Sequence, residues 1–261
     1  MTKPKRIPYE ATVTNVMTVS PSIRRVTLKS SNTEQFTSES KGGYFKFVFT
    51  ESGETDITGL TEEQKTVLRT YTIRDYEDTT GEITVDLVLH LTNDHNCGFA
   101  SRWAESVSVG DTISLVGPGK SPYPDFTHDA VFFVADMTAL PALSVALAQI
   151  PSDARGHAVI EVATEKDIQS LNHPDGVKLS WVISDQNQSL TSTVRQMPWP
   201  EGIVDVWCAC EFDMMKSLRQ YFRNERQVGK DHIYISSYWK NGVSEDGHKV
   251  IKRQDLQNES S

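Results

Sequence analysis

Cysteine is scarce in this chain of 261 residues, which contains only Cys97, Cys208 and Cys210. Such a small, odd number excludes the disulfide scaffold that stabilises small secreted domains. Cys208 and Cys210 fall in an expected strand, where alternate residues share one face, but their spacing is not that of a zinc knuckle or a thioredoxin motif. We therefore expect a protein of the reducing cytoplasm.

Long apolar runs and an excess of positive charge are also lacking. The most apolar window, residues 131–148, contains Asp136 and Pro141 and is too short to span about 30 Å of hydrocarbon. The basic N-terminus, residues 1–9, has no apolar core of the kind that a signal peptide needs. The net charge is −9, and residues 1–125 hold 13 Lys and Arg against 17 Asp and Glu. We expect no membrane span, no secretion and no nucleic-acid binding.

Motifs of hydrolases and metalloproteins are lacking too. The sequence has no Gly-x-Ser-x-Gly elbow, no His-Glu-x-x-His and no Walker loop. Its seven histidines include one close pair, His90 and His95, whose spacing suits no standard metal site, so no bound metal ion is expected. Gly and Pro number only 15 and 11, and 38% of the residues are apolar, so the chain is globular, with one large domain or two small ones.

Residues 1–125 are predicted to form a closed or nearly closed antiparallel barrel of six strands. Their apolar residues alternate with period two, turns separate the alternating segments, and only residues 99–107 favour a helix. The expected strands are residues 11–19, 23–29, 43–50, 69–74, 82–90 and 112–116.

Residues 126–261 are predicted to form a Rossmann-like α/β domain, because continuous apolar strands here alternate with helices. The polar residues 252–261 are expected to be a frayed tail. The expected strands are residues 130–135, 157–163, 177–184, 204–210 and 232–236, and the expected helices are residues 139–149, 190–197 and 213–226.

The first segment that suggests chemistry is residues 69–74, Arg-Thr-Tyr-Thr-Ile-Arg. In a strand, Arg69 and Tyr71 share one face, so a guanidinium that can bind a phosphate lies near a ring that can stack on a flat heterocycle, with Thr72 beside them. Taken alone, so short a pattern is more often an ordinary surface strand.

Two further segments of the first half could bind a cofactor. The strand over residues 84–90 ends at His90, whose ring and neighbouring amides could bind a ribityl chain or a pyrophosphate, or could simply be solvated. Residues 97–104 read as a turn that opens a helix near Ser101, where free amides favour a phosphate. Ser101 could instead be an N-cap.

In the second half, residues 136–141 follow a buried strand and open a helix, where a nucleotide-binding fold has its phosphate loop. The glycines of Gly-x-Gly-x-x-Gly are absent there, so a standard dinucleotide site is doubtful. Tyr238 and Trp239 follow the last expected strand as two exposed aromatics, which could pack at the core edge or stack on a flavin.

Taken together and in order, six segments of this chain resemble the siderophore-interacting proteins, which are FAD-containing ferric-siderophore reductases related to ferredoxin–NADP reductases. These segments cover nearly the whole chain. They are Arg69-Thr-Tyr-Thr-Ile-Arg74, Val85-Asp-Leu-Val-Leu-His90, Gly98-Phe-Ala-Ser-Arg-Trp-Ala104, Gly117-Pro-Gly-Lys-Ser121, Asp136-Met-Thr-Ala-Leu-Pro-Ala142 and Ser237-Tyr-Trp-Lys-Asn-Gly242.

The resemblance implies that residues 1–125 are a flavin-binding barrel, that residues 126–261 resemble an NAD(P)H-binding domain, and that FAD is bound. The family's Arg-x-Tyr-Thr strand maps onto Arg69, Tyr71 and Thr72. The other residues expected at the cofactors are Asp86, Val88, Leu89, His90, Ala100, Ser101, Trp103, Asp136, Thr138, Ala139, Tyr238 and Trp239.

Three departures from the family pattern accompany this resemblance. Phe99 stands where the family usually has proline, and Ala135 and Cys210 stand where it usually has glycine. The last two lie where a nicotinamide cofactor would dock, so the electron donor, NAD(P)H or reduced ferredoxin, stays open.

The resemblance also implies a basic cluster that receives an anionic ferric siderophore, for which Lys46, Lys120 and Lys240 are the candidates. Bound FAD would pass single electrons to the iron, and no residue would act as a general acid or base. We expect a monomer with a ferric siderophore as partner and ferredoxin as a further candidate partner. A flavin reductase that releases its flavin and a nonenzymatic siderophore-binding module are the alternatives.

Overall fold

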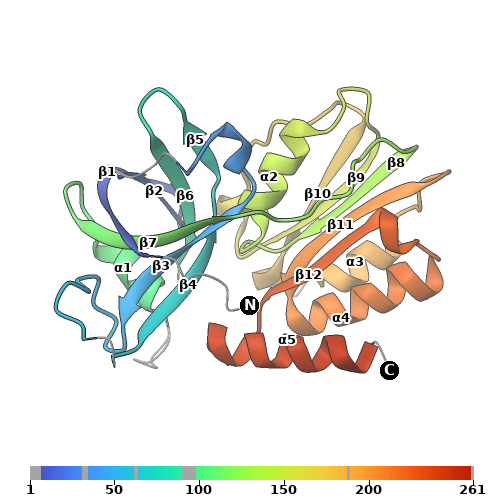
Figure 1. Ribbon diagram of the computed structural model, residues 1–261. Helices are drawn as coiled ribbons and strands as arrows, with labels where there is room; N and C mark the ends of the chain where they lie inside the picture. The colour runs from blue at the N-terminus through green and yellow to red at the C-terminus, as the bar shows by residue number, and fades with distance from the viewer. Residues whose placement is uncertain (1–6, 31–34, 62–63, 90–97, 187–188, 260–261) are drawn as a thin grey trace. The chain divides into compact units, whose positions relative to one another are not determined.

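The computed structural model describes residues 7–30, 35–61, 64–89, 98–186 and 189–259. The chain divides into two compact units, Met1–Ser121 and Pro122–Ser261 (Figure 1). In the described residues no helix is both long and apolar enough to cross a membrane.

The first unit is a curved antiparallel sheet of seven strands in the order β4-β3-β7-β1-β2-β6-β5. Its two edge strands, β4 and β5, follow each other in the chain and are joined by Ile73 and Arg74. The Ile73 amide donates to the carbonyl of Gly43, next to β3, at 2.9 Å, and the Arg74 amide donates to the carbonyl of Thr84, in β6, at 2.9 Å. The sheet thereby nearly closes on itself. The strands are β1 (Tyr9–Ser20), β2 (Ile23–Lys29), β3 (Tyr44–Thr50), β4 (Thr66–Thr72), β5 (Asp75–Glu77), β6 (Glu82–Val88) and β7 (Thr112–Gly119).

The expectation of six strands is thus corrected to seven. The additional strand, β5, has only three residues, Asp-Tyr-Glu, of which Tyr76 alone is buried. Three residues are too few to show an alternating pattern, so β5 is defined by its pairing with β6 and not by its own sequence.

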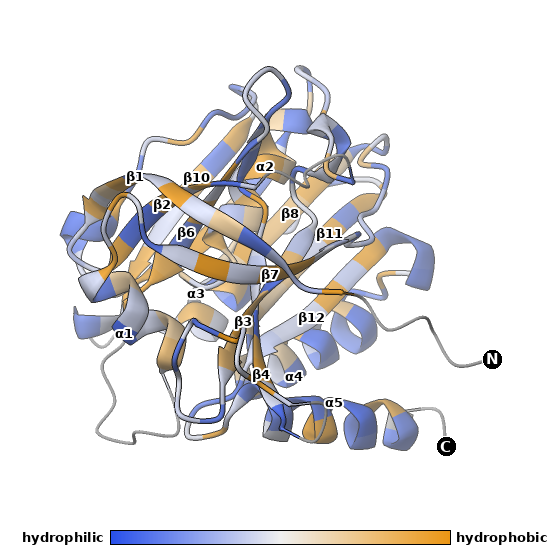
Figure 2. Ribbon diagram, turned by 60° about the vertical axis from the view of Figure 1, so that its left-hand side comes forward, coloured by the Kyte–Doolittle hydropathy of each residue, from blue (hydrophilic) through white to orange (hydrophobic). Residues whose placement is uncertain are grey.

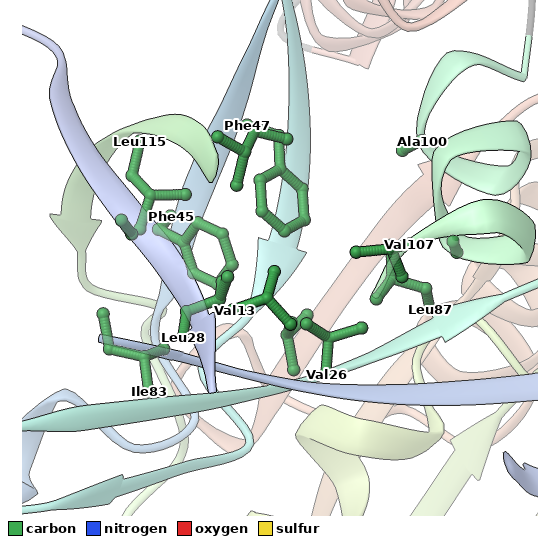
Figure 3. Packing of buried hydrophobic residues seen from close by; sticks show 14 of the residues in the cluster. Val13, Val26, Leu28, Phe45, Phe47, Ile83, Leu87, Ala100, Val107 and Leu115 are labelled. Atoms are coloured by element: carbon green, nitrogen blue, oxygen red, sulfur yellow. The ribbon is translucent and has the colours of Figure 1, made fainter. Parts of the chain in front are cut away.

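The core of the first unit is built from the inward faces of these strands (Figure 3). Phe45 and Phe47 alternate along β3, are fully buried and meet edge to face with ring centroids 5.0 Å apart. Helix α1 (Phe99–Ser106) packs against this core and contributes Ala100 and Ala104 to it. The first turn of α1 is thereby fixed against the barrel.

The second unit is a parallel sheet of five strands in the order β10-β9-β8-β11-β12. Strand order reverses between β8 and β11, and in such sheets ligands bind beyond the carboxyl ends of the strands at this point. The strands are β8 (Ala130–Ala135), β9 (Gly156–Val162), β10 (Val177–Ile183), β11 (Val204–Glu211) and β12 (Ile233–Trp239).

Helices cover both faces of this sheet. Residues of α3 (Leu190–Gln196) and α4 (Phe212–Gln220) share one core cluster with β8 and β11, and α2 (Leu140–Gln149) packs on the other face (Figure 1). The strands carry broad hydrophobic stretches, as Figure 2 shows. Because both faces are covered, these strands are continuously apolar and do not alternate. This is the Rossmann-like arrangement expected from the sequence.

The expectation of a frayed tail over residues 252–261 is wrong for residues 252–259, the part of it that the structure describes. Residues 245–259 form a fifth helix, α5 (Glu245–Glu259), and Asp255 on it accepts two hydrogen bonds from Arg219, at 2.8 and 3.1 Å. His248 is buried, and its Nε2 lies 2.8 Å from Ser237 Oγ. Polar contacts hold α5 in place and Figure 2 shows it as largely hydrophilic, so its sequence has little of the apolar periodicity that would have indicated a helix.

Candidate functional site

Strand β4 carries the first expected cofactor residues. The Arg69 guanidinium lies over the Phe99 ring, 5.5 Å from its centroid, and donates a hydrogen bond of 3.0 Å to the carbonyl of Leu68. Tyr71 is half-buried, with its ring centroid 5.4 Å from that of Phe47. The strand therefore places a cation against the first residue of α1 and an aromatic ring against the barrel core.

Helix α1 begins beside Arg69 without a side-chain cap. Its N-cap, Gly98, has a φ of 68°, in the left-handed region, and no side chain among the described residues bonds to the cap. The first-turn amides of a helix have no intrahelical acceptor, and the helix dipole is positive there. Ala100 and Ser101 are buried in that turn. An uncapped helix start next to a guanidinium can hold a phosphate.

Phe99 gives this turn its shape. Two guanidiniums lie near its ring, that of Arg69 at 5.5 Å and that of Arg102 at 5.2 Å from the centroid. At Gly53, a Cβ atom would come within 2.7 Å of Phe99 Cδ1, so only glycine allows this approach. A pocket of about 290 Å³ opens beside the ring, at the lower end of the range for small-molecule sites. It is lined by Ser52, Gly53, Glu54, Thr55, Phe99, Arg102, Trp103 and Ser106.

Two further expected residues of this region lie at the edge of the core. The Trp103 ring packs on Phe47, with centroids 5.0 Å apart, and also lines the pocket beside Phe99. Thr72 ends β4 opposite Tyr44 and is half-buried. Both positions can reach a ligand at β4 while contributing to the packing of the barrel.

At the end of β6, part of the backbone is already hydrogen-bonded within the barrel. Val88 is its half-buried last residue, and the Leu89 amide donates a hydrogen bond of 2.8 Å to the carbonyl of Ser22. Leu89 therefore has no amide to offer a cofactor, whatever its side chain contacts. His90 lies outside the described residues.

Asp86 is buried between two arginines. Its carboxylate accepts from Arg25 Nε at 2.6 Å and Arg25 Nη2 at 2.7 Å, and Arg74 Nε lies 3.1 Å away. The hydrogen bond to Asp86 raises the pKa of Arg25, whereas burial lowers the pKa of Arg74. The three groups together carry one net positive charge, so Asp86 positions two guanidiniums that can face an anion.

Arg25 is a residue that the sequence did not single out. It stands directly opposite Asp86 in the pairing of β2 with β6, a register that can be known only once the sheet is assembled. Its contribution to the charge beside Arg74 is therefore a finding of the structure.

The three candidate lysines differ in their surroundings. In the first unit, Lys46 donates to Thr70 Oγ1 and lies 5.7 Å from the centroid of the Tyr44 ring, and Lys120 is exposed just after Gly119, the β7 partner of Tyr44. These two lysines therefore lie on neighbouring strands near one end of the sheet.

Lys240, in the second unit, has two carboxylate neighbours. It bonds to Asp213, and Glu211 Oε1 lies 3.7 Å from its ammonium. These contacts raise its pKa, with the hydrogen bond to Asp213 as the largest cause. Its charge is more than offset locally, which makes it a weaker anion receptor than its sequence position suggests.

At the carboxyl end of β8, the Asp136 side chain accepts hydrogen bonds from the turn that follows it. Its Oδ1 accepts from Thr138 N at 2.9 Å, Thr138 Oγ1 at 2.6 Å and Ala139 N at 3.2 Å. In a glycine-rich loop these amides would face the pyrophosphate of a dinucleotide. Burial is the largest influence on this carboxyl group and raises its pKa. Thr138 and Ala139 thus hold Asp136 in the described structure.

Trp239 is tied to the same carboxylate. Its indole N–H donates to Asp136 Oδ2 at 2.7 Å, and the residue is still 38% exposed. The ring is therefore held at one edge and open to a partner. Tyr238 differs from the expected exposed aromatic because it is partly buried, and burial raises its pKa well above the ordinary value. Its hydroxyl bonds with Tyr234, which places it in the packing of this unit.

Two glutamates complete this end of the sheet. Glu211 caps α4, since its Oε2 accepts from Asp213 N at 2.6 Å, and its Oε1 accepts from Asn241 N at 3.1 Å. Glu161, near the end of β9, has its pKa raised to about 7 by burial, with the nearby Asp136 charge as a second cause. Glu161 could not be recognised from the sequence, because its burial arises only from the packing around β9.

Comparisons with known proteins place both units in one family. The siderophore-interacting FAD-binding domain matches residues 12–122, and the siderophore-interacting protein family matches residues 128–242. The ferric vibriobactin reductase ViuB of Vibrio cholerae is 30% identical over 247 residues, which are 88% of this chain and 88% of that protein.

Solved structures agree with this assignment. The siderophore-interacting protein SipS of Aeromonas hydrophila superimposes with a TM-score of 0.82 and 27% identity, covering 97% of this chain and 99% of that one. Ferredoxin-NADP+ reductase of Plasmodium falciparum, at a TM-score of 0.64 and 12% identity over 88% of this chain and 96% of that one, shares the fold.

Proposed function

This chain belongs to the siderophore-interacting protein family, and we propose that it is a ferric-siderophore reductase, an FAD-dependent oxidoreductase that passes electrons to the iron of a ferric siderophore. Ferrous iron, which hard oxygen ligands hold far more weakly than ferric iron, is then released for use in the cytoplasm. We further propose that the chain acts as a monomer.

One observation supports flavin binding above the others, namely that Arg69 lies against Phe99 at the uncapped start of α1. A guanidinium and the N-terminal end of a helix, where the dipole is positive, are two groups that favour a pyrophosphate. In this proposal the barrel unit binds FAD, Arg69 and the α1 turn hold its phosphates, and Tyr71 and Thr72 face its ring system. When bound, the flavin supplies stored electrons that can be delivered one at a time.

The protein's own contribution is position and charge. Arg25 and Arg74 share the single charge of Asp86, so this group keeps positive charge on the sheet. We propose that Lys46 and Lys120 receive the anionic ferric siderophore, while the charge of Lys240 is taken up by Asp213 and Glu211. No proton transfer by a side chain is needed, because the iron only gains an electron.

The electron donor follows from Asp136. A dinucleotide pyrophosphate at the end of β8 would compete with this carboxyl group for the amides of Thr138 and Ala139. We propose that NAD(P)H binds weakly and that reduced ferredoxin is the faster donor. The α/β unit then serves mainly to carry Trp239 and the loops around it.

The test begins with the purified protein and its visible spectrum after desalting. We expect bound flavin, and anaerobic mixing of the reduced protein with a ferric siderophore should reoxidise the flavin while a ferrous chelator detects the iron released. Loss of flavin on desalting would instead indicate a flavin reductase. Siderophore binding without iron reduction would indicate a binding module and would overturn the proposal.

The donor is tested separately by stopped-flow reduction of the bound flavin. Reduced ferredoxin should reduce it faster than NADPH, whose half-saturating concentration should lie near or above the upper end of the usual range, about 1 mM. Saturation at micromolar NADPH would refute the argument from Asp136 and leave the reductase proposal intact.

A further inference from the structure

The amino ends of three neighbouring strands in the second unit bring together two histidines and an aspartate. His128 precedes β8, Asp205 is the second residue of β11, and His232 directly precedes β12. Strand β11 lies between β8 and β12, and all three run parallel. The group therefore lies at the edge of the sheet opposite to Asp136 and Glu211, away from the residues assigned to electron transfer.

The three side chains converge closely. His128 Nδ1 lies 2.9 Å from Asp205 Oδ2, and His232 Nδ1 lies 3.1 Å from Asp205 Oδ1. One ligand atom from each residue can be chosen so that all lie within 4.8 Å of one another. The two imidazole rings meet edge to face with centroids 4.4 Å apart. Asp125 Oδ1, at 3.5 Å from His128 Nδ1, is the next carboxylate outward.

Burial distinguishes this group from an ordinary surface cluster. The Asp205 side chain is fully buried, with 0% exposure, while the His128 and His232 side chains are 32% and 29% exposed. A buried carboxylate is costly unless it is paired with a cation or bound to a metal. The partners of Asp205 in the described structure are the two imidazoles and the His128 amide, which donates at 3.3 Å.

The spacing suits a metal ion. Ligands about 2.0–2.1 Å from a tetrahedral Zn²⁺ lie about 3.3 Å from one another. Asp205 Oδ1 alone lies 3.0 Å from His128 Nδ1 and 3.1 Å from His232 Nδ1, so these two distances need to open by only a few tenths of an ångström for an ion to replace the shared protons. Two imidazoles and one carboxylate form a donor set that favours Zn²⁺ and neighbouring divalent transition ions over Mg²⁺ or Ca²⁺. The exposed side of the histidines leaves room for water or Asp125 as a fourth ligand.

We propose that His128, Asp205 and His232 form a binding site for a divalent transition-metal ion, with Zn²⁺ as the representative ion. The bound ion joins the amino ends of β8, β11 and β12 and stabilises the α/β unit, without taking part in the reduction of the siderophore. The sequence expectation of no metal is set aside here, because His128 and His232 are far apart in the chain and no local motif could have shown their meeting.

The test uses the purified, flavin-loaded protein after removal of metal ions by a chelator. Titration with Zn²⁺ against a chromophoric competitor should show one ion bound per chain, and Co²⁺ in its place should give the visible absorption of a tetrahedral site. His232→Gln and His128→Gln should each weaken Zn²⁺ binding roughly tenfold or more and should abolish the cobalt spectrum. His173→Gln, at another partly buried histidine, is the matched control and should change nothing.

Flavin content and far-UV circular dichroism should stay at native values in the three variants, which separates loss of the site from loss of the fold. Zn²⁺ should raise the unfolding temperature of the native protein and of His173→Gln, but not that of His232→Gln. Absence of stoichiometric binding by the native protein at micromolar Zn²⁺, or equal binding by native protein and both site variants, would overturn the proposal and identify the group as a hydrogen-bonded His-Asp-His cluster only.

Discussion

The hydrogen bond between Asp136 and Trp239 offers a sharp test of how the carboxyl end of the α/β sheet is built. Asp136 is 4% exposed and receives the indole N–H at 2.7 Å, across a large separation in sequence. We would change the two partners singly and together, as Asp136→Asn, Trp239→Phe and the double variant. Asn keeps an oxygen for Thr138 and Ala139 but turns an NH₂ group toward the indole, and Phe keeps most of the ring without its N–H.

The expected energies follow from this geometry. A hydrogen bond to a charged acceptor contributes about 1.5–3 kcal/mol, and a buried donor left without an acceptor costs a similar amount. Asp136→Asn should therefore lower the free energy of unfolding by about 2–3 kcal/mol, and Trp239→Phe by about 1–2 kcal/mol. The double variant should lose no more than Asp136→Asn alone, which gives a coupling energy of at least about 1 kcal/mol.

Urea unfolding followed by far-UV circular dichroism measures these energies without relying on the fluorescence of the altered tryptophan. Trp199→Phe, in a ring cluster with Phe132 and Phe222, is the matched control, and its effect should add to that of Asp136→Asn. A coupling energy below about 0.5 kcal/mol between Asp136 and Trp239 would be indistinguishable from additivity. That result would show that the indole is not held by the carboxylate, and the reasoning about this turn would fail.

Three other predictions concern charge. Arg69→Ala should weaken FAD binding roughly tenfold or more, through loss of about 1.5–3 kcal/mol, and stoichiometric FAD after dialysis would contradict this. Glu161, with its pKa raised from 4.5 to about 7, favours its protonated form when folded, so it destabilises the fold increasingly as pH rises from about 4.5 to 7. Glu161→Gln should then stabilise the protein at pH 8 by about 1–2 kcal/mol, a value smaller than the full pKa shift implies because the side chain is partly exposed. Urea unfolding should show this gain at pH 8 and none near pH 4. Lys46→Ala and Lys120→Ala should each weaken binding of an anionic ferric siderophore a few-fold in a flavin titration at low salt, and by less at high salt. Lys240→Ala should leave this binding unchanged. A larger loss of binding with Lys240→Ala than with the other two variants would reverse the assignment.

Regular elements with a strong hydrophobic pattern were predictable from the sequence. The apolar run 130–135 coincides with β8, and the expected helix over residues 139–149 begins one residue before α2. Elements without such a pattern were not predictable. Strand β5 is too short to alternate, and α5 is held by Asp255 and His248 through polar contacts. The hydrophobic pattern therefore revealed the elements that apolar burial stabilises and missed those that pairing or polar contacts define.

The same distinction between local patterns and contacts made only in the assembled fold applies to the candidate site. Arg69 and the turn before α1 could be recognised because each lies in a short local motif, and the structure brings Arg69 against Phe99 at that turn. Partners that meet only through strand register could not be recognised, as with Arg25 opposite Asp86. The same holds for the environment of Lys240, whose charge looked available in sequence and is offset by carboxylates in space.

Asp136 shows how a single side chain can change the ligand of a shared fold. In the usual nucleotide-binding turn, glycines leave the amides at the end of the first strand open, and a pyrophosphate satisfies them. Here the carboxylate of Asp136 satisfies the amides of Thr138 and Ala139 within the protein and fixes the Trp239 indole with its other oxygen. A dinucleotide would have to displace a buried group that already makes four hydrogen bonds, so binding would forfeit those bonds before it gained any. The turn is thus stabilised without a ligand, which is the observation on which the proposal of weak NAD(P)H binding rests.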